Sequence, residues 1–264
     1  MTRVQRYAAG RARALGLATR GTTAPNRLRR VDRWLTGAHG HLLVAGTAPP
    51  LVVDLGYGAT PVTTVELHRR LREVRPDTQV VGLEIDPERV AAAQGVEADG
   101  LRFARGGFEL AGLRPLVVRA LNVLRQYDEE QAAAAWATMT AGLAGGGLLV
   151  EGTSDEVGRR AAWVALGRDG PRSLTLAAHV PSLHRPGELA ERLPKALIHR
   201  NVPGEPVHAL LRALDDAWDR AAPYAPLGNR QRWVAACTAL DWPQLHRGRR
   251  RFGELSVPWA TLAP

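Results

Sequence analysis

LVVDLGYGATP, residues 51–61, is the stretch that decides the fold of this chain. It begins with a continuous apolar run, which is typical of a β-strand buried on both faces of a sheet. Two glycines follow, Gly56 and Gly58, and Pro61 stands where prolines commonly begin helices. The stretch therefore predicts a strand, a tight glycine turn and a helix that starts near Pro61.

The alternation of strand and helix continues toward the C-terminus. A second apolar strand is expected over 79–85, and Asp86-Pro87 then begins a helix that ends near Gln94, with the aspartate as its N-cap. Further strands are expected over 101–104, 116–121 and 148–152, and a helix over 128–143. Such alternation implies parallel pairing with right-handed crossovers. We predict a doubly wound α/β fold, with a mostly parallel sheet and helices on both faces.

Both ends of the chain add to this core. Residues 1–24 lack apolar periodicity and are expected to form a flexible basic arm, after which a basic helix begins at Pro25. Beyond Asp155 we expect a short helix, strands over 173–180 and 196–202, helices over 207–221 and 230–240, and an extended final dozen residues. The prediction is therefore an arm, an α/β domain over 25–204, and a C-terminal helical extension over 205–264 that packs on the core.

The composition favours a cytoplasmic protein. A single cysteine, Cys237, excludes an intrachain disulfide, and no Cys/His cluster has the spacing of a zinc site. Arginines interrupt the start of the chain too often for a secretory signal. The uncharged stretch 131–150 is rich in alanine and carries three consecutive glycines, which favours helix, turn and strand over a membrane span. We therefore predict neither a membrane segment nor a bound metal.

The positive charge is unevenly distributed. The net charge is +9, and the first 35 residues hold nine arginines against one acid. A second basic cluster, Arg247 to Arg251, lies near the C-terminus. Such clusters bind phosphate backbones, so RNA is one partner hypothesis, while a solubilising role is the simpler one. A small-molecule substrate is favoured over nucleic acid.

The glycine turn after the first strand suits a ligand that lies against the backbone, because a β-carbon there would collide with it. Dinucleotides place a pyrophosphate at such a turn, and Asp54 would repel that charge. An ammonium group, as in the methionine part of S-adenosylmethionine (SAM), would instead be attracted. Asp54 therefore favours SAM over NAD and argues against a dinucleotide oxidoreductase.

A second carboxylate stands where the next strand ends. Glu84, at the carboxyl edge of the strand over 79–85, is placed to accept hydrogen bonds from both hydroxyls of a ribose. The nearby Asp86 is assigned instead to the helix cap.

These two segments, Asp54-Leu-Gly56-Tyr-Gly58 and Gly82-Leu-Glu84-Ile-Asp86-Pro87, resemble motifs I and II of the class I SAM-dependent methyltransferases, which have a Rossmann-like fold. The resemblance covers roughly residues 50–155. It implies that Asp54 contacts the methionine amino group, that Glu84 holds the ribose, and that Gly107 with Phe108 frames the adenine. The full set of cofactor-binding residues expected on this basis is Asp54, Gly56, Tyr57, Gly58, Glu84, Ile85, Gly107, Phe108 and Asn122.

The sequence departs from the family pattern at three places. Thr60 replaces the third glycine of motif I and is expected to cap the following helix. Gly106-Gly107-Phe108 stands where relatives usually offer an aspartate to adenine, so backbone groups and an apolar wall would hold that ring. The fourth strand carries Arg119 and Asn122 where many relatives have acidic or aromatic residues. Substrate chemistry is therefore not transferable.

Methyl transfer asks little of side chains, because an in-line approach to a good leaving group supplies much of the acceleration. If the acceptor must lose a proton, the candidate bases are Glu151, Asp128, His179 and His184, with structural roles favoured for the histidines. Asn122 and Tyr127 either line the pocket or anchor loops. The sequence thus predicts a SAM-dependent methyltransferase with an unidentified acceptor, and the alternative is a non-catalytic SAM- or nucleotide-binding protein.

Overall fold

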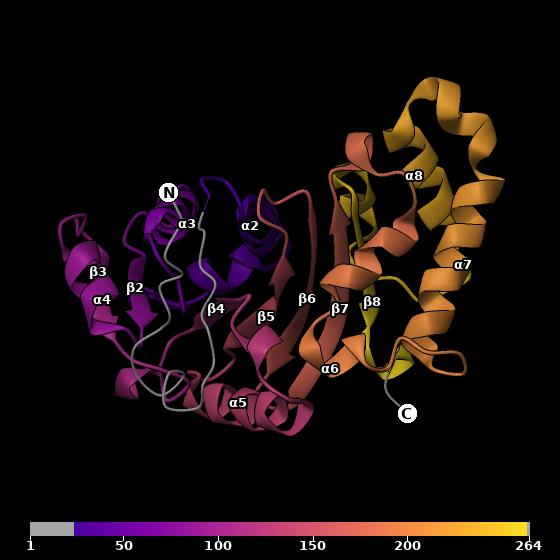
Figure 1. The fold of residues 1–264 in the computed structure, drawn as a ribbon. Helices are drawn as coiled ribbons and strands as arrows, with labels where there is room; N and C mark the ends of the chain where they lie inside the picture. Colours follow the sequence, from indigo (N-terminus) through magenta and orange to yellow (C-terminus); the bar gives the residue numbers. More distant parts are fainter. Residues whose placement is uncertain (1–23, 263–264) are drawn as a thin grey trace, which may run out of the picture.

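A computed structural model describes residues 24–262. One sheet of eight strands runs through it in the order β3-β2-β1-β4-β5-β6-β7-β8 (Figure 1). The basic arm predicted over 1–24 lies almost wholly outside the described residues. The strands are β1 (Leu51–Leu55), β2 (Gln79–Glu84), β3 (Leu101–Arg105), β4 (Val117–Leu121), β5 (Leu148–Ser154), β6 (Arg160–Gly167), β7 (Gly170–Ala178) and β8 (Glu254–Pro258).

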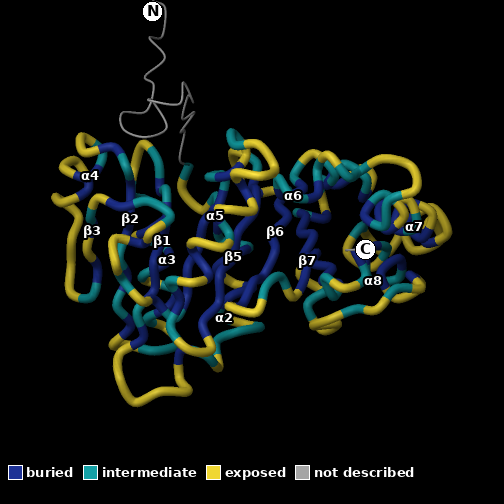
Figure 2. The backbone as a smooth tube through the Cα atoms, turned by 90° about the horizontal axis from the view of Figure 1, so that it is seen from below, coloured by how far each residue is buried: buried dark blue, intermediate teal, exposed yellow. Residues whose placement is uncertain are grey.

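The first five strands form the predicted parallel sheet. β1 pairs with β2 and β4, β2 with β3, and β4 with β5, all parallel. One face is covered by α2 (Arg29–Val44), α3 (Val62–Arg72) and α4 (Pro87–Gln94), and the other by α5 (Glu129–Gly142), as Figure 1 shows. Strands between two helical layers are buried along most of their length, as the dark tube in Figure 2 shows. The doubly wound, Rossmann-like α/β prediction is confirmed.

The remaining strands are antiparallel, and here two sequence predictions were wrong. The short helix expected after Asp155 is the strand β6, which forms hairpins with β5 and β7. Its alanines suit either state, and what decides is burial on both faces, where Trp163 meets Trp34 of α2 at 5.5 Å between ring centroids. The strand expected over 196–202 is a short helix, α6 (Lys195–Ile198), which follows Pro194.

The C-terminal part is helical, as predicted, with one strand added. α7 (Pro206–Arg220) and α8 (Asn229–Ala239) pack on each other and bury Trp218 and Trp233 in the core. The final segment then returns to the sheet as β8, antiparallel to β7. The division into domains at residues 204 and 205 stays a prediction.

The uncharged stretch 131–150 divides, as expected, into most of α5, a glycine turn and the start of β5. Asp128 begins α5 as one half of a capping box with Gln131. Over residues 24–262, no helix combines the length and apolar character needed to span a membrane.

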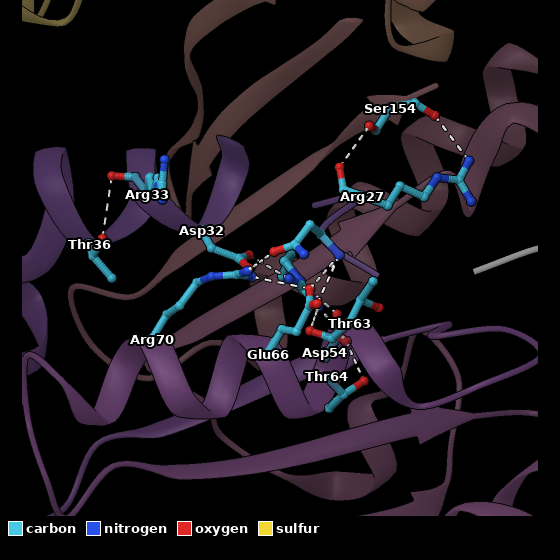
Figure 3. A network of polar contacts seen from close by, with 12 residues as sticks. Arg27, Asp32, Arg33, Thr36, Asp54, Thr63, Thr64, Glu66, Arg70 and Ser154 are labelled. Carbon is cyan, nitrogen blue, oxygen red and sulfur yellow. Dashed lines mark hydrogen bonds and ion pairs between the residues drawn. The ribbon is translucent and has the colours of Figure 1, made fainter. Parts of the chain in front are cut away.

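A buried ionic network joins α2, β1, β4 and α3. Arg119 of β4 is fully buried and donates from Nε and Nη2 to the two carboxylate oxygens of Asp54, at 2.8 and 2.6 Å. Its Nη1 donates to Asp32 of α2 at 2.5 Å, and Asp32 in turn accepts from Arg70 of α3 (Figure 3). Glu66 completes the chain on α3 through Arg70. The network thus ties one helical layer to the centre of the sheet.

The charges in this network depend on one another because little water reaches them. Burial alone would lower the pKa of Arg119, but the charges of Asp32 and Asp54 outweigh it and raise that pKa. Burial raises the pKa of Asp32, and the guanidinium groups of Arg119 and Arg70 oppose that shift. Since each oxygen of Asp32 contacts a guanidinium at 2.5 Å, we treat Asp32 as a carboxylate.

Removal of Arg119 should therefore be costly. We expect Arg119→Met to lower the free energy of unfolding by about 3–5 kcal/mol, because Asp32 and Asp54 lose the cation that they share in a dry environment. Arg102→Met, at an exposed position on β3, is the control and should change stability by less than about 0.5 kcal/mol. Urea denaturation measures both. Equal stability of the two variants would contradict the importance of the network.

Candidate functional site

A cavity of ≈ 790 Å³ opens at the carboxyl edge of the parallel strands, beside the ends of β1, β2 and β4. Parallel topology brings these strand ends together, which is why sequence motifs tens of residues apart meet there. Every residue predicted to bind the cofactor lines this cavity: Asp54, Gly56, Tyr57, Gly58, Glu84, Ile85, Gly107, Phe108 and Asn122. That they bind SAM stays a prediction.

The turn after β1 requires its glycines. Gly56 has φ +69° and Gly58 has φ +83°, a left-handed backbone that disfavours side chains. A β-carbon on Gly56 would also lie 2.8 Å from Cγ2 of Val123. The expectation that Thr60 caps the next helix was wrong, because the N-cap of α3 is Pro61 and no side chain bonds to the helix end.

Glu84 links the two motifs. Its Oε2 accepts a hydrogen bond from the backbone N–H of Gly58 at 3.0 Å, and its Oε1 accepts from Ile85 N–H at 2.9 Å. Arg89 approaches Oε2 at 3.6 Å from α4. Asp86 N–H adds a longer bond to Oε1 at 3.4 Å, so four donors hold a carboxylate that is only 4% exposed and borders the cavity. The neighbouring Asp86 caps α4 by accepting from Glu88 N–H at 2.9 Å, as predicted.

Asp54 is less free than the sequence suggested. Besides both bonds from Arg119, its Oδ2 accepts from the Thr64 hydroxyl at 2.6 Å. Pairing with Arg119 weakens the field that a lone carboxylate would present to a ligand ammonium. The network as a whole contains three carboxylates and two guanidiniums, and Asp54 is the member of it that lines the cavity.

The end of the cavity expected to hold adenine is partly apolar. Phe108 and Tyr127 pack edge to face with ring centroids 5.5 Å apart. Burial, followed by the charge of Glu84, raises the pKa of the Tyr127 hydroxyl. Glu109, which sequence analysis missed, also lines the cavity, and its Oε1 accepts from Gly107 N–H at 2.7 Å. An acid is therefore present near this end, two residues after the glycine where relatives were expected to offer one.

Asn122 combines the two roles weighed for it. It lines the cavity, and its Oδ1 accepts from Ser154 N–H at 2.9 Å, which anchors the end of β5. Its backbone has φ +64°, a conformation that asparagine tolerates better than most residues.

Three arginines at the cavity escaped the sequence analysis. Arg27, Arg89 and Arg105 all line it. Arg27 donates to the carbonyls of Ser154 and Asp155, so the residue before α2 is bound to the end of β5 (Figure 3). No motif marks these positions. The position of Arg105, directly after a predicted strand, was the one signal that could have found it.

The candidate bases lie in different surroundings. Asp128 serves as the cap of α5, His184 is exposed, and His179 belongs to a second cavity described below. Glu151 is 2% exposed on β5, and its Oε2 accepts a hydrogen bond from Nε1 of Trp136 at 3.2 Å. Burial raises the pKa of Glu151 to about 8, against a weak opposing effect of that bond. Among residues 24–262, no group of three acidic, histidine or cysteine side chains is arranged to hold a metal.

No protein-family model and no curated protein matches this sequence. Solved structures match it in fold. Human N-acetylserotonin methyltransferase with SAM matches at 18% identity and a TM-score of 0.33, over 47% of this chain and 36% of that one. Magnesium protoporphyrin IX methyltransferase from Synechocystis with SAM matches at 19% identity and a TM-score of 0.35, over 50% of this chain and 65% of that one. An O-methyltransferase family 2 protein from Planctomyces limnophilus with apigenin matches at 21% identity and a TM-score of 0.32, over 47% of this chain and 42% of that one.

This chain therefore spans less than two thirds of each of those three proteins. The likeness to these three methyltransferases is one of fold alone, and it covers about half of this chain or less.

Glu151 should make stability depend on pH. Its pKa is raised in the folded state, so its contribution is favourable below about pH 4.5 and is lost as the pH rises toward 8. We expect Glu151→Gln to become more stable than the parent protein over this interval, by up to about 1.4 kcal/mol per pH unit. Denaturant midpoints at pH 5, 6, 7 and 8 measure the effect, with the exposed Glu130→Gln as control. Parallel pH profiles for Glu151→Gln and the parent would contradict it.

Proposed function

We propose that this protein is a SAM-dependent methyltransferase that transfers a methyl group from SAM to an acceptor, with a small molecule favoured. The observation that carries the proposal is the meeting of the Gly56–Gly58 turn and the Glu84 carboxylate at one cavity. The cavity volume of ≈ 790 Å³ falls within the range of about 300–1,000 Å³ common for ligand and cofactor sites.

The residues around the cavity fit the parts of SAM. Glu84, held by backbone N–H groups, has lone pairs left to accept the hydroxyls of a ribose. Phe108 and Tyr127 offer an apolar wall to the adenine. The left-handed turn of Gly56 and Gly58 leaves the backbone bare where the methionine part would pass. When bound, SAM would supply an electrophilic methyl group on a sulfonium.

Asp54 would act on the ammonium of SAM through its network. Its bonds to Arg119 fix the carboxylate in place, and as the network acid that lines the cavity it would attract a cation there. This is a weaker attraction than the direct pairing implied by the family resemblance.

The chain's own contribution to transfer would be to position the acceptor and exclude water. Alignment of an acceptor atom with the methyl group supplies most of the acceleration that such a reaction needs. Gln126 and Tyr127, which border the cavity from the segment after β4, are placed to contact an acceptor. Glu151 is buried and does not border the cavity, so it is not proposed as a base.

A non-catalytic SAM- or nucleotide-binding protein is the second candidate. It is favoured by the state of Asp54, whose two oxygens already accept hydrogen bonds from Arg119 and Thr64 and are less available to a ligand ammonium.

Calorimetry tests cofactor binding. We expect SAM and S-adenosylhomocysteine to bind and NAD to bind weakly or not at all. Glu84→Gln should weaken SAM binding about 10- to 100-fold, because the ribose hydroxyls lose a charged acceptor. Glu88→Gln, at an exposed position in the first turn of α4, is the matched control and should bind as the parent does. Binding of NAD alone, or unchanged SAM affinity in Glu84→Gln, would refute the assignment.

Catalysis is tested separately, with a metabolite extract and SAM labelled on its methyl group. We expect label to appear in a small molecule with the parent protein and to fall at least about tenfold with Glu84→Gln at subsaturating SAM. If SAM binds but no labelled product forms, either from the metabolite extract or from added RNA, the result would favour the non-catalytic candidate.

A further inference from the structure

A second cavity, of ≈ 530 Å³, opens at the same edge of the sheet. It lies between the start of α2, the end of β7, the start of α8 and the 3-10 helix η6 (Arg247–Phe252). Six arginines meet there, five of them from the two basic stretches of the sequence and one from α8, and we call this cavity the arginine pocket. They are Arg29, Arg30, Arg33, Arg230, Arg249 and Arg251.

Most of this positive charge is unmatched. Glu254 is the one acid that lines the pocket, and Arg249 already pairs with it at 2.5 Å. Arg30 donates to two backbone carbonyls at 3.1 Å, which fix its guanidinium without neutralising it. Within residues 24–262, the other four arginines form no ion pair with a carboxylate. The pocket therefore carries an excess of five positive charges.

The placement of these arginines is unfavourable for the fold itself. Arg29 and Arg30 begin α2, and Arg230 lies in the first turn of α8. Helix amino ends are positive, so they favour acids and disfavour cations. Burial, followed by the charge of Arg29, lowers the pKa of Arg30. The same pattern, burial followed by Arg30, lowers the pKa of His179 at the pocket wall. A bound anion would relieve all of these interactions.

The pocket also offers an aromatic surface. Phe252 is 48% exposed, and the guanidinium carbons of Arg251 and Arg249 lie 4.8 and 5.2 Å from its ring centroid. A flat ring beside several cations suits a ligand that joins a planar base to a chain of phosphates. A lone carboxylate, with one charge, would leave most of the excess unmatched. An oligophosphate supplies three or more charges and the oxygen geometry that guanidinium groups prefer.

We propose that the arginine pocket is a nucleotide site, which binds the di- or triphosphate of a nucleoside phosphate through Arg33, Arg230 and Arg251 and its base against Phe252. Three strand spacings of about 4.8 Å separate β4 from β7, so this site lies on the order of 14 Å from the cofactor cavity along the sheet edge. The proposal does not rest on the methyltransferase assignment.

Binding of inorganic triphosphate and of ATP, each in magnesium-free buffer, tests this proposal by calorimetry. The double variant Arg33→Ala/Arg251→Ala should lower the affinity for both ligands at least about tenfold, since each lost guanidinium removes a charge-assisted hydrogen bond. Both positions are exposed, so the fold should be retained. The control Arg114→Ala/Arg168→Ala removes the same charge at exposed positions at the opposite edge of the sheet and should bind as the parent does. Phe252→Ala should lower the affinity for ATP at least threefold and leave the affinity for triphosphate unchanged.

Further measurements show where the anion binds. Arg105→Ala, which removes an exposed cation that lines the cofactor cavity, should leave triphosphate affinity unchanged, and a loss there would assign the anion to the cofactor cavity and overturn the proposal. Equal affinities in the two double variants, or no binding by the parent protein, would also overturn it. Binding of a single-stranded RNA 20-mer without binding of ATP or triphosphate would replace the nucleotide site by a nucleic-acid surface.

Discussion

The guanidinium of Arg119 joins the central sheet of this protein to one of its helical layers. It lies at the centre of the sheet on β4, bonds both oxygens of Asp54 on the adjacent strand, and reaches through the helical layer to Asp32 of α2. Two buried carboxylates so close together would repel each other without a shared cation. The position of α2 over the sheet, the rotamer of Asp54 and the wall of the cofactor cavity therefore all depend on one side chain.

The same constraint shapes the candidate site. Asp54 is immobilised because Arg119 and Thr64 hold it, and Glu84 is immobilised by backbone N–H groups from both motifs. Two carboxylates set in fixed positions around a bare glycine turn form a preorganised site, in which little rearrangement is needed when a ligand enters. Because both carboxylates already accept hydrogen bonds, their role is to orient a polar ligand. The proposed methyl transfer requires mainly that donor and acceptor are held in position.

The antiparallel half of the sheet forms the second cavity at the same edge as the first. Because β6 and β7 return as hairpins and β8 joins them, the start of α2 and the chain between α8 and β8 come together at the end of β7. Arg27 and Arg30 both bind carbonyl groups of the segment 154–158, which runs from the end of β5 into the turn before β6. Arg27 lines the cofactor cavity and Arg30 lines the arginine pocket. One turn at the start of α2 therefore contributes to both sites.

The sequence alone determined the parallel core and the edge where its motifs meet. Apolar periodicity, glycine turns and the cap at Asp86 are local signals, and parallel topology then placed Asp54, Glu84 and Gly107 at one cavity without further information. Tertiary structure alone decided the rest. The alanine-rich segment 160–167 became a strand because its alternate residues pack into the two hydrophobic clusters on opposite faces of the sheet, one of which includes Trp34. The pairing of Asp54 with Arg119, and the meeting of arginines from both ends of the chain, depend on which strands and helices become neighbours, and no local pattern of residues encodes those contacts.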